Sequence, residues 1–407
     1  MKCRMCESQN LFEFLDLGST PPADEFKTAE QLREPDTYYP LQVWMCEDCG
    51  LAQLGYVVPP EILYQNDYPY ESSTTQAGRD HWAGFAGSVV SELGLKPGQL
   101  AVDIGSNVGV LLEAFKNNGM QVYGVDPAPN IVEKARERGI DTICAFFGME
   151  SAQDIVDAKG RASVITGTNV FAHINDLTAF AQAVKILLAD DGALIIEAPY
   201  FANLVADCEY DTIYHEHLSY ISVRPVTKFF QRFGMEVFDV QQTEIHGGSL
   251  RIFVSRTGRK TVSPEVARLV AHEEETGLHT EETLSAFAGA VEQNRKDLLG
   301  LLYRIKIEGK SIVGLSAPAK GMTLLNYCGM GKEVLDFVTE KSPLKIGRFT
   351  PGGHIPVVPD EELLRVQPDY ALLLAWNFAE EIMRNLDEYR RAGGRFIIPI
   401  PTPRFIP

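Results

Sequence analysis

The sequence predicts an α/β fold in three parts. Residues 99–115 and 310–321 each read as an apolar strand, a glycine-containing turn and the start of a helix. Further strand and helix patterns alternate after both. The first 66 residues differ, because they carry two C-x-x-C pairs. We expect a metal-binding part at 1–66, a Rossmann-like part at 67–260, and linking helices with a second Rossmann-like part at 261–407.

Composition and charge exclude several classes of partner. The 407 residues suffice for two to four domains at roughly 100–200 residues each. A net charge of −18 offers no broad basic face to a nucleic acid or to an anionic membrane. No apolar run approaches the ~18 residues of a membrane span, and the N-terminus has no secretory pattern. The sequence therefore predicts a cytoplasmic protein.

Four of the seven cysteines have the spacing of a zinc site: Cys3, Cys6, Cys46 and Cys49. Gly50 follows the second pair and suits a tight knuckle, where a positive φ is needed. Disulfides are the alternative, but a cytoplasmic location disfavours them. A redox role would need only one pair. Because four thiolates close the coordination shell, the predicted Zn²⁺ is structural.

The turn after the strand at 99–104 favours a nucleoside cofactor. Asp103, Gly105, Asn107 and Gly109 form a D-x-G-x-N-x-G pattern, in which the glycines allow close approach of a ligand. A second strand at 121–126 ends in Asp126, which can accept the ribose hydroxyls. The spacing does not fit the dinucleotide fingerprint. A carboxylate at the strand tip would repel a pyrophosphate but attract the cationic groups of S-adenosylmethionine. A turn that only packs a helix on the sheet is the alternative.

The remaining strands bring more polar residues to the same edge of the sheet. A strand at 162–168 leads to Asn169 and His173, and one at 193–198 leads to Tyr200. Strands at 236–240 and 249–255 form a closing hairpin. Ligands of such sheets bind at the carboxyl ends of the strands. These side chains are therefore candidates to surround a ligand together with Asp103 and Asp126.

The densest polar cluster follows at 211–220. Tyr214, His215, Glu216 and His217 can supply a base, an orienting carboxylate and a hydrogen-bond donor. The H-E-x-x-H spacing of a metal site is absent. Methylation of a carbon beside a ketone needs a base to form the enolate, and a neutral histidine can act so. Methylation of a hydroxyl would use the same residues. A structural polar loop is the remaining alternative.

The last third reads as two helices at 264–309 and a second Rossmann-like unit. Strands are expected near 334–338, 370–375 and 395–400. Lys320 lies at a predicted helix N-terminus, where a phosphate can bind. Together with Lys345, Arg348 and His354 it forms the basic pocket that an anionic substrate would need. A packing domain with scattered surface lysines is the alternative.

These motifs together resemble the sugar C-methyltransferases of deoxysugar biosynthesis, such as the enzymes for mycarose and tetronitrose. The resemblance covers essentially the whole chain. It rests on the paired cysteines and on D-I-G-S-N-V-G at 103–109, N-V-F-A-H-I at 169–174, Y-H-E-H-L-S-Y at 214–220, H-G-G-S-L-R at 246–251, S-A-P-A-K-G at 316–321 and G-R-F-I-I-P-I-P at 394–401. It implies a class I methyltransferase Rossmann-like core between a zinc-binding domain and a C-terminal Rossmann-like domain.

The resemblance also implies roles for individual residues. His217 is similar to the base, Tyr214 and Glu216 to its partners around the enolate, and His173 to a further active-site histidine. Tyr68 or Tyr70 is similar to a tyrosine that shields the methionine end of the cofactor. The expected substrate-binding residues are Asn169, Tyr200, Arg251, Lys320, Arg348 and His354.

The expected reaction is methylation at C3 of a nucleotide-linked 4-keto-6-deoxy sugar, with dTDP as the expected nucleotide and a monomeric enzyme. C5, which also lies beside the ketone, and a sugar hydroxyl are alternative acceptors. A non-catalytic zinc-containing binding protein is the alternative from a different class.

Overall fold

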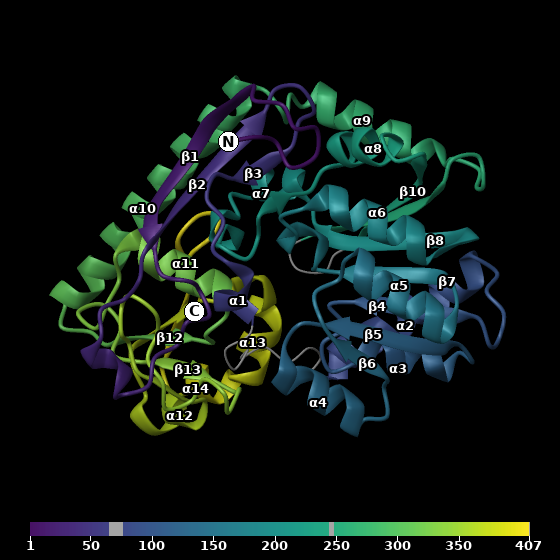
Figure 1. Ribbon diagram of the computed structural model, residues 1–407. Coiled ribbons are helices and arrows are strands. Elements are labelled where there is room, and N and C mark those ends of the chain that lie inside the picture. The colour runs from purple at the N-terminus through teal and green to yellow at the C-terminus, as the bar shows by residue number, and fades with distance from the viewer. Residues whose placement is uncertain (65–75, 244–247, 407) are drawn as a thin grey trace.

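The computed structural model describes residues 1–64, 76–243 and 248–406, and these form three β-sheets with their helices. In Figure 1 a seven-stranded sheet lies on the right, and the N-terminal strands and a C-terminal six-stranded sheet lie on the left. Within the described ranges, no helix is both long enough and apolar enough to cross a membrane.

The seven-stranded sheet has the order β10-β11-β8-β7-β4-β5-β6. Its strands are β4 (Leu100–Ile104), β5 (Gln121–Asp126), β6 (Thr142–Cys144), β7 (Ala162–Thr168), β8 (Leu188–Pro199), β10 (Met235–Thr243) and β11 (Ser249–Arg256). Only β11 runs antiparallel to its neighbours, which confirms the predicted closing hairpin. The chain reverses its direction of travel across the sheet between β4 and β7, which is where ligands bind in such folds.

Six helices accompany this sheet: α2 (Gln76–Glu92), α3 (Val110–Asn117), α4 (Pro129–Glu137), α5 (Met149–Lys159), α6 (Leu177–Leu187) and α8 (Val223–Gln231). Helix α3 follows the glycine turn as expected, and its Leu111, Leu112 and Phe115 are buried. The apolar faces of these helices cover strands that are themselves buried on both sides. The predicted Rossmann-like core is thus confirmed.

The N-terminal sheet has the order β1-β2-β3-β9. It comprises β1 (Leu11–Thr20), β2 (Tyr39–Cys46) and β3 (Ala52–Leu54), with a 3-10 turn η1 (Gln31–Arg33) before β2 and a short helix α1 (Pro60–Tyr64) after β3. Its fourth strand, β9 (Ser219–Tyr220), comes from the end of the polar cluster. A sheet of the first residues therefore extends directly into the region that carries the candidate chemistry.

The C-terminal part begins with two helices, as predicted: α9 (Pro264–Glu275) and α10 (Glu281–Ile307). Its sheet has the order β14-β13-β12-β15-β16-β17, formed by β12 (Ile312–Leu315), β13 (Val338–Glu340), β14 (Val357–Pro359), β15 (Tyr370–Leu373), β16 (Arg395–Ile398) and the antiparallel β17 (Arg404–Ile406). Helices α11 (Ala319–Cys328), α12 (Glu361–Val366), α13 (Ala379–Asn385) and α14 (Asp387–Arg391) complete the unit.

The prediction of a strand at 334–338 is wrong, because the strand in this part of the chain, β13, begins at Val338. Val334 and Leu335 are fully buried, but their N–H groups both bond to the Gly331 carbonyl in a turn, and the strand begins only at Val338. Apolar residues in a buried turn and in a buried strand have the same pattern over so short a run.

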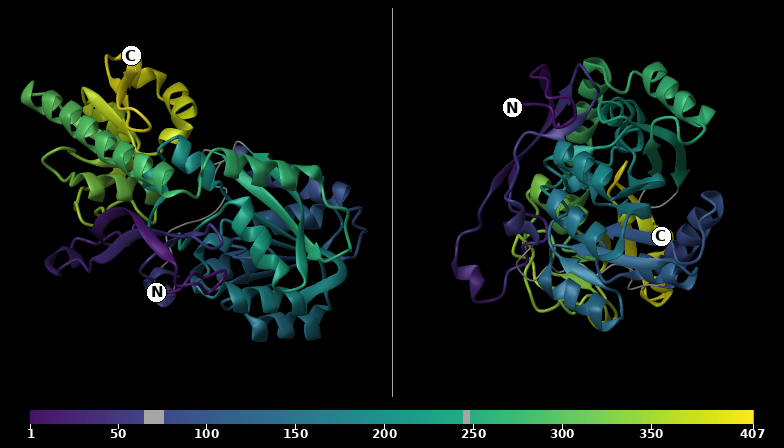
Figure 2. Two further views of the ribbon diagram at one scale, coloured as in Figure 1. Left: turned by 90° about the horizontal axis from the view of Figure 1, so that it is seen from above. Right: turned by 45° about the vertical axis from the view of Figure 1, so that its right-hand side comes forward.

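The sheets share their cores. One apolar cluster joins Phe14 and Leu41 of the N-terminal strands to α10 and to the C-terminal sheet. In Figures 1 and 2 the long helix α10 runs beside β1, over the C-terminal strands. A second cluster places Cys3 and Cys46 with the core of the seven-stranded sheet. The N-terminal part therefore packs against both other parts of the molecule.

Candidate active site

The loop after β4 has the backbone that its glycines predicted. Gly105 and Gly109 have φ of +68° and +81°, and Asn107 between them has φ of +49°. A Cβ at Gly105 would lie 2.9 Å from Cγ2 of Val170, so no larger residue fits there without a shift. The loop therefore keeps its backbone close to the ends of β4 and β7. This close approach suits a ligand lying across the loop.

Two carboxylates flank this loop. Asp103 is buried, and its Oδ1 accepts a hydrogen bond of 2.6 Å from the Thr166 hydroxyl. Burial raises the pKa of Asp103 to about 7, although the Thr166 bond opposes the rise and the charge of Asp126 adds to it. The two oxygens of Asp126 accept the N–H groups of Asn107 and Ala128, at 2.9 and 3.0 Å. Burial also raises the pKa of Asp126.

These residues fit S-adenosylmethionine. Each oxygen of Asp126 keeps a second lone pair that can accept a ribose hydroxyl. Asp103 can hold a cation at the strand tip. The hydroxyl oxygen of Ser106 is buried and has no hydrogen-bond partner among the described residues, so the loop also holds a polar group ready for a ligand.

The tautomer of His217 is fixed by a backbone carbonyl. Nδ1 of His217 lies 2.7 Å from the carbonyl oxygen of Thr212. A carbonyl only accepts, so Nδ1 carries the proton, and Nε2 of the neutral ring carries a lone pair. Thr212 belongs to the 3-10 turn η3 (Tyr210–Thr212). The imidazole is therefore prepared to accept a proton at Nε2, as a general base must.

Two further rings lie against His217. The Tyr214 ring lies 4.0 Å from it between centroids, and the His173 ring lies 5.0 Å away. His173 is in the 3-10 turn η2 (Phe171–His173), and its Nδ1 is 3.1 Å from the Tyr64 hydroxyl. Burial, and secondly the nearby His217, hold the pKa of His173 well below its ordinary value. His173 therefore stays neutral beside His217.

Glu216 and Tyr64 belong to the same cluster. Glu216 is buried. Burial raises the pKa of the Tyr64 hydroxyl well above its ordinary value, and the negative charge of Glu216 raises it further. Tyr64 thus stays a hydrogen-bond donor. No sequence pattern indicates Tyr64, because it lies in no motif and is more than 100 residues from His173.

His215 points away from this cluster. Its Nε2 lies 3.2 Å from the carbonyl of Tyr39 on β2, and its ring packs edge-on against the Tyr39 ring. Burial lowers the pKa of His215. The two histidines of the Y-H-E-H motif thus face different parts of the molecule, and only His217 joins His173 and Tyr214.

Two expected substrate-binding side chains have partners inside the protein. Tyr200 is buried, and its hydroxyl donates to Glu273 of α9 at 3.0 Å. Arg251 is buried in an ion pair with Glu197 at the end of β8, at 2.8 Å. In this structure, the polar groups of both side chains are therefore bonded to other residues of the protein. Asn169 lies at the carboxyl end of β7, with φ of +56°.

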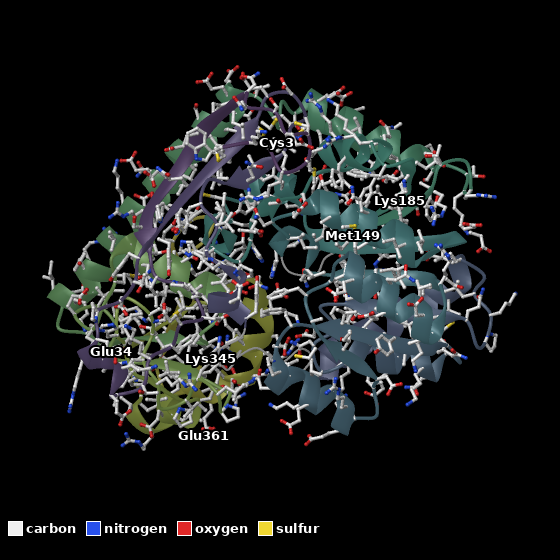
Figure 3. All side chains as sticks on the ribbon, in the orientation of Figure 1. Cys3, Glu34, Met149, Lys185, Lys345 and Glu361 are labelled. Atoms are coloured by element: carbon white, nitrogen blue, oxygen red, sulfur yellow. The ribbon has the colours of Figure 1, made fainter. Side chains whose placement is uncertain are left out.

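Two of the four residues expected to form a basic pocket are paired with acidic residues of the protein itself. Lys345, labelled in Figure 3, bonds to Asp24 at 2.9 Å, and His354 bonds to Asp36 at 2.8 Å. Both acids come from the N-terminal segment that precedes β2. Arg348 is half-buried on the same loop as Lys345. Tyr68 and Tyr70 lie outside the described residues.

Lys320 lies elsewhere, in the first turn of α11. Its Nζ is 3.9 Å from the centroid of the Trp376 ring and 3.9 Å from Oδ2 of Asp211. Asp211 immediately precedes Thr212, whose carbonyl holds His217. Lys320 is therefore linked, through Asp211, to the turn whose carbonyl contacts His217.

The four paired cysteines converge as predicted. Their sulfur atoms lie within 4.8 Å of one another, and the pairs Cys3–Cys49 and Cys6–Cys46 are each 3.5 Å apart. The thiols are free, so the disulfide alternative is wrong. Tetrahedral Zn²⁺ with Zn–S bonds of ~2.3 Å would space its sulfurs by about 3.8 Å, which is close to the observed arrangement. Figure 3 labels Cys3 near the junction of the N-terminal strands with the seven-stranded sheet and its helices.

Three family models match the chain: "Putative zinc binding domain" at residues 3–64, "Methyltransferase domain" at 80–240 and "C-methyltransferase C-terminal domain" at 244–401. C-methyltransferase NovU of Streptomyces niveus is 37% identical over 406 residues, which cover 100% of this chain and 96% of NovU. A ubiquinone biosynthesis O-methyltransferase of Xanthomonas campestris is 28% identical over 121 residues, 28% of this chain and 51% of that protein. The crystal structure of magnesium protoporphyrin IX methyltransferase from Synechocystis with bound SAM covers 46% of this chain and 87% of its own, with 17% identity and a TM-score of 0.34.

Fold, loop and matched models together define a methyltransferase that depends on S-adenosylmethionine and carries a structural zinc site. More narrowly, the chain belongs to the C-methyltransferase family, since a relative matches it from end to end. The expected enzyme class is thereby confirmed, and the alternative of a non-catalytic binding protein is set aside.

Proposed function

We propose that the enzyme methylates C3 of a nucleotide-linked 4-keto-6-deoxy sugar, with His217 as the base. The observation that carries the proposal is the 2.7 Å contact between Nδ1 of His217 and the Thr212 carbonyl. It leaves Nε2 as the basic nitrogen in a cluster with Tyr214 and His173. Transfer to carbon requires such a base, because a carbon beside a ketone becomes a nucleophile only after it loses its proton.

Each residue of the histidine cluster has its own role in the proposed reaction. Nε2 of His217 takes the proton from the carbon beside the keto group, and the electron pair of that C–H bond moves onto the keto oxygen as an enolate. A phenol hydroxyl, for which Tyr214 is the candidate, hydrogen-bonds the enolate oxygen. S-adenosylmethionine, when bound, would supply an electrophilic methyl group: the enolate carbon would form a bond to it as the bond from that methyl to sulfur breaks, and S-adenosylhomocysteine would leave. His173 stays neutral and so adds no second positive charge beside the imidazolium.

The substrate class follows from the acceptor chemistry and the basic residues. A diphosphate needs cationic or N–H partners, and Lys320 near the histidine cluster and Arg348 are the candidates. We propose dTDP as the nucleotide. C5 and a sugar hydroxyl remain alternative acceptors, because the same histidine could serve both. We also propose the division at residues 66 and 260, a monomeric state and a cytoplasmic location.

The proposal is tested with His217→Asn and with His215→Asn as a matched control, since His215 faces Tyr39. With a dTDP-4-keto-6-deoxy sugar and a deuterated methyl donor, the wild-type enzyme and the control should add one labelled methyl, which NMR should locate on C3. His217→Asn should lower turnover by about 10²–10⁴-fold, the range a positioned base contributes.

A second measurement isolates the base. In D₂O, the wild-type enzyme should exchange the C3 proton of the sugar for deuterium, and His217→Asn should not. Turnover or exchange that survives in His217→Asn contradicts the assignment. A methyl found on oxygen or on C5 contradicts the proposed position.

A further inference from the structure

We infer that the C-terminal part positions the catalytic base, with Trp376 and Thr323 as positioning residues. This inference rests on the proposed role of His217. The contact between Nδ1 of His217 and the Thr212 carbonyl favours the tautomer with the proton on Nδ1. The peptide that bears this carbonyl is held from both sides by side chains of the C-terminal part, although Thr212 itself lies in the methyltransferase part of the chain.

On the N-terminal side of Thr212, side chains of the C-terminal part contact the carboxylate of Asp211. The indole Nε1 of Trp376 donates to Oδ2 of Asp211 at 2.7 Å, and Lys320 lies 3.9 Å from the same oxygen while packing on the Trp376 ring. Asp211 is fully buried. A bond from an N–H to a buried carboxylate is among the stronger hydrogen bonds in proteins. It fixes η3 to the segment that follows β15.

On the C-terminal side of Thr212, a side chain of the C-terminal part bonds to the carbonyl of Ile213. The hydroxyl of Thr323, in α11, donates to the Ile213 carbonyl at 3.0 Å, and both residues are buried. A third contact fixes the start of η3, because the Tyr210 hydroxyl donates to Asn294 of α10 at 2.9 Å. Nδ2 of Asn294 in turn bonds the Pro399 carbonyl at 2.9 Å.

These contacts have a common consequence. Residues 210–213 cannot shift relative to the C-terminal part without breaking buried hydrogen bonds, so the Thr212 carbonyl stays in one place. If it moved, the Nδ1–H form of His217 would lose its acceptor and the other tautomer would compete. That tautomer places a proton on Nε2, where the proposed mechanism needs a lone pair.

The test uses Trp376→Phe and Thr323→Val, which remove the donors and keep most of the volume. Each should lower kcat about ten- to hundredfold, the loss expected from a small misplacement of a catalytic group. The KM for S-adenosylmethionine should stay within about twofold. In protein labelled with ¹⁵N-histidine, the ring nitrogens of His217 should change from the Nδ1–H pattern to a mixture. Thr323→Ser keeps the hydroxyl and should restore the wild-type values.

Matched controls are Trp44→Phe on β2 and Thr227→Val, whose hydroxyl donates to the Val223 carbonyl within its own helix. Neither should change kcat or the ¹⁵N pattern. An unchanged ¹⁵N pattern in Trp376→Phe and Thr323→Val overturns the inference, as does an unchanged kcat. The ¹⁵N measurement needs no substrate, so it is decided separately from the His217→Asn experiment. Failure of that experiment alone would refute the base and leave the positioning contacts intact.

Discussion

We expect the affinity for the cofactor to depend on pH through the carboxyl group of Asp103. Its carboxyl lies at the end of β4, and burial raises its pKa to about 7. In the absence of cofactor the group therefore binds a proton as the pH falls through 7. The ammonium and sulfonium of S-adenosylmethionine favour the ionised form. Below pH 7, binding must expel that proton, so the dissociation constant should rise as the pH falls.

The size of the effect follows from the pKa. With a value of about 7, roughly nine-tenths of Asp103 is ionised at pH 8 and roughly one-tenth at pH 6. The dissociation constant should therefore rise about tenfold between pH 8 and pH 6, which is about 1.4 kcal/mol of binding free energy. About one proton should be released for each cofactor bound at pH 6.

Isothermal titration calorimetry measures both quantities, the protons from titrations in buffers of different ionisation enthalpy. Asp103→Asn should bind about ten- to a hundredfold more weakly at pH 8, since a charged hydrogen bond is worth about 1.5–3 kcal/mol. It should also lose the slope between pH 6 and 8. The control Asp141→Asn changes an exposed carboxylate next to β6 and should keep the slope. A wild-type affinity that does not vary with pH, or a slope that persists in Asp103→Asn, refutes the reasoning.

Two further predictions concern stability. Cys46→Ser should lose bound zinc, which atomic emission measures. It should also lower the melting temperature, because the metal links the cysteines of the N-terminal part, which packs against both other sheets. Cys144→Ser, at an exposed thiol, should do neither. A Cys46→Ser protein that melts like the wild type would exclude a structural role. Glu197→Gln should cost about 3–5 kcal/mol of unfolding free energy in urea titrations, because it leaves Arg251 buried without its charge partner. Glu292→Gln, at an exposed ion pair, should leave the unfolding free energy almost unchanged, and equal losses in the two variants would contradict this reasoning.

The core of the fold could be predicted because its signals are local. The glycine turn and the acid at the end of β5 each lie within a few residues of one strand end, and the closing hairpin joins two strands that are consecutive in the chain. The cysteine cluster could be predicted for a different reason. Metal ligands impose a spacing within each pair, and Cys3 and Cys46 need no other signal to meet.

The basic residues show where such prediction ends. Lys345 and His354 have the right charge for a phosphate, but their nearest partners, Asp24 and Asp36, are more than 300 residues away in the chain. No pattern in the sequence links them. Local composition reports the charge of a side chain and not what neutralises it. Tyr200 was placed near the site by the end of its strand, whereas its hydroxyl reaches Glu273 on a later helix.

The three parts of the chain meet at residues 213–217, and each part contacts a different residue there. The Tyr39 carbonyl of the N-terminal sheet lies 3.2 Å from Nε2 of His215, and β9, which joins that sheet, begins two residues after His217. The C-terminal part holds the peptide of Ile213 through Thr323. The seven-stranded sheet contributes His173 beside His217. The position of His217, the proposed base, thus depends on contacts from all three parts of the chain.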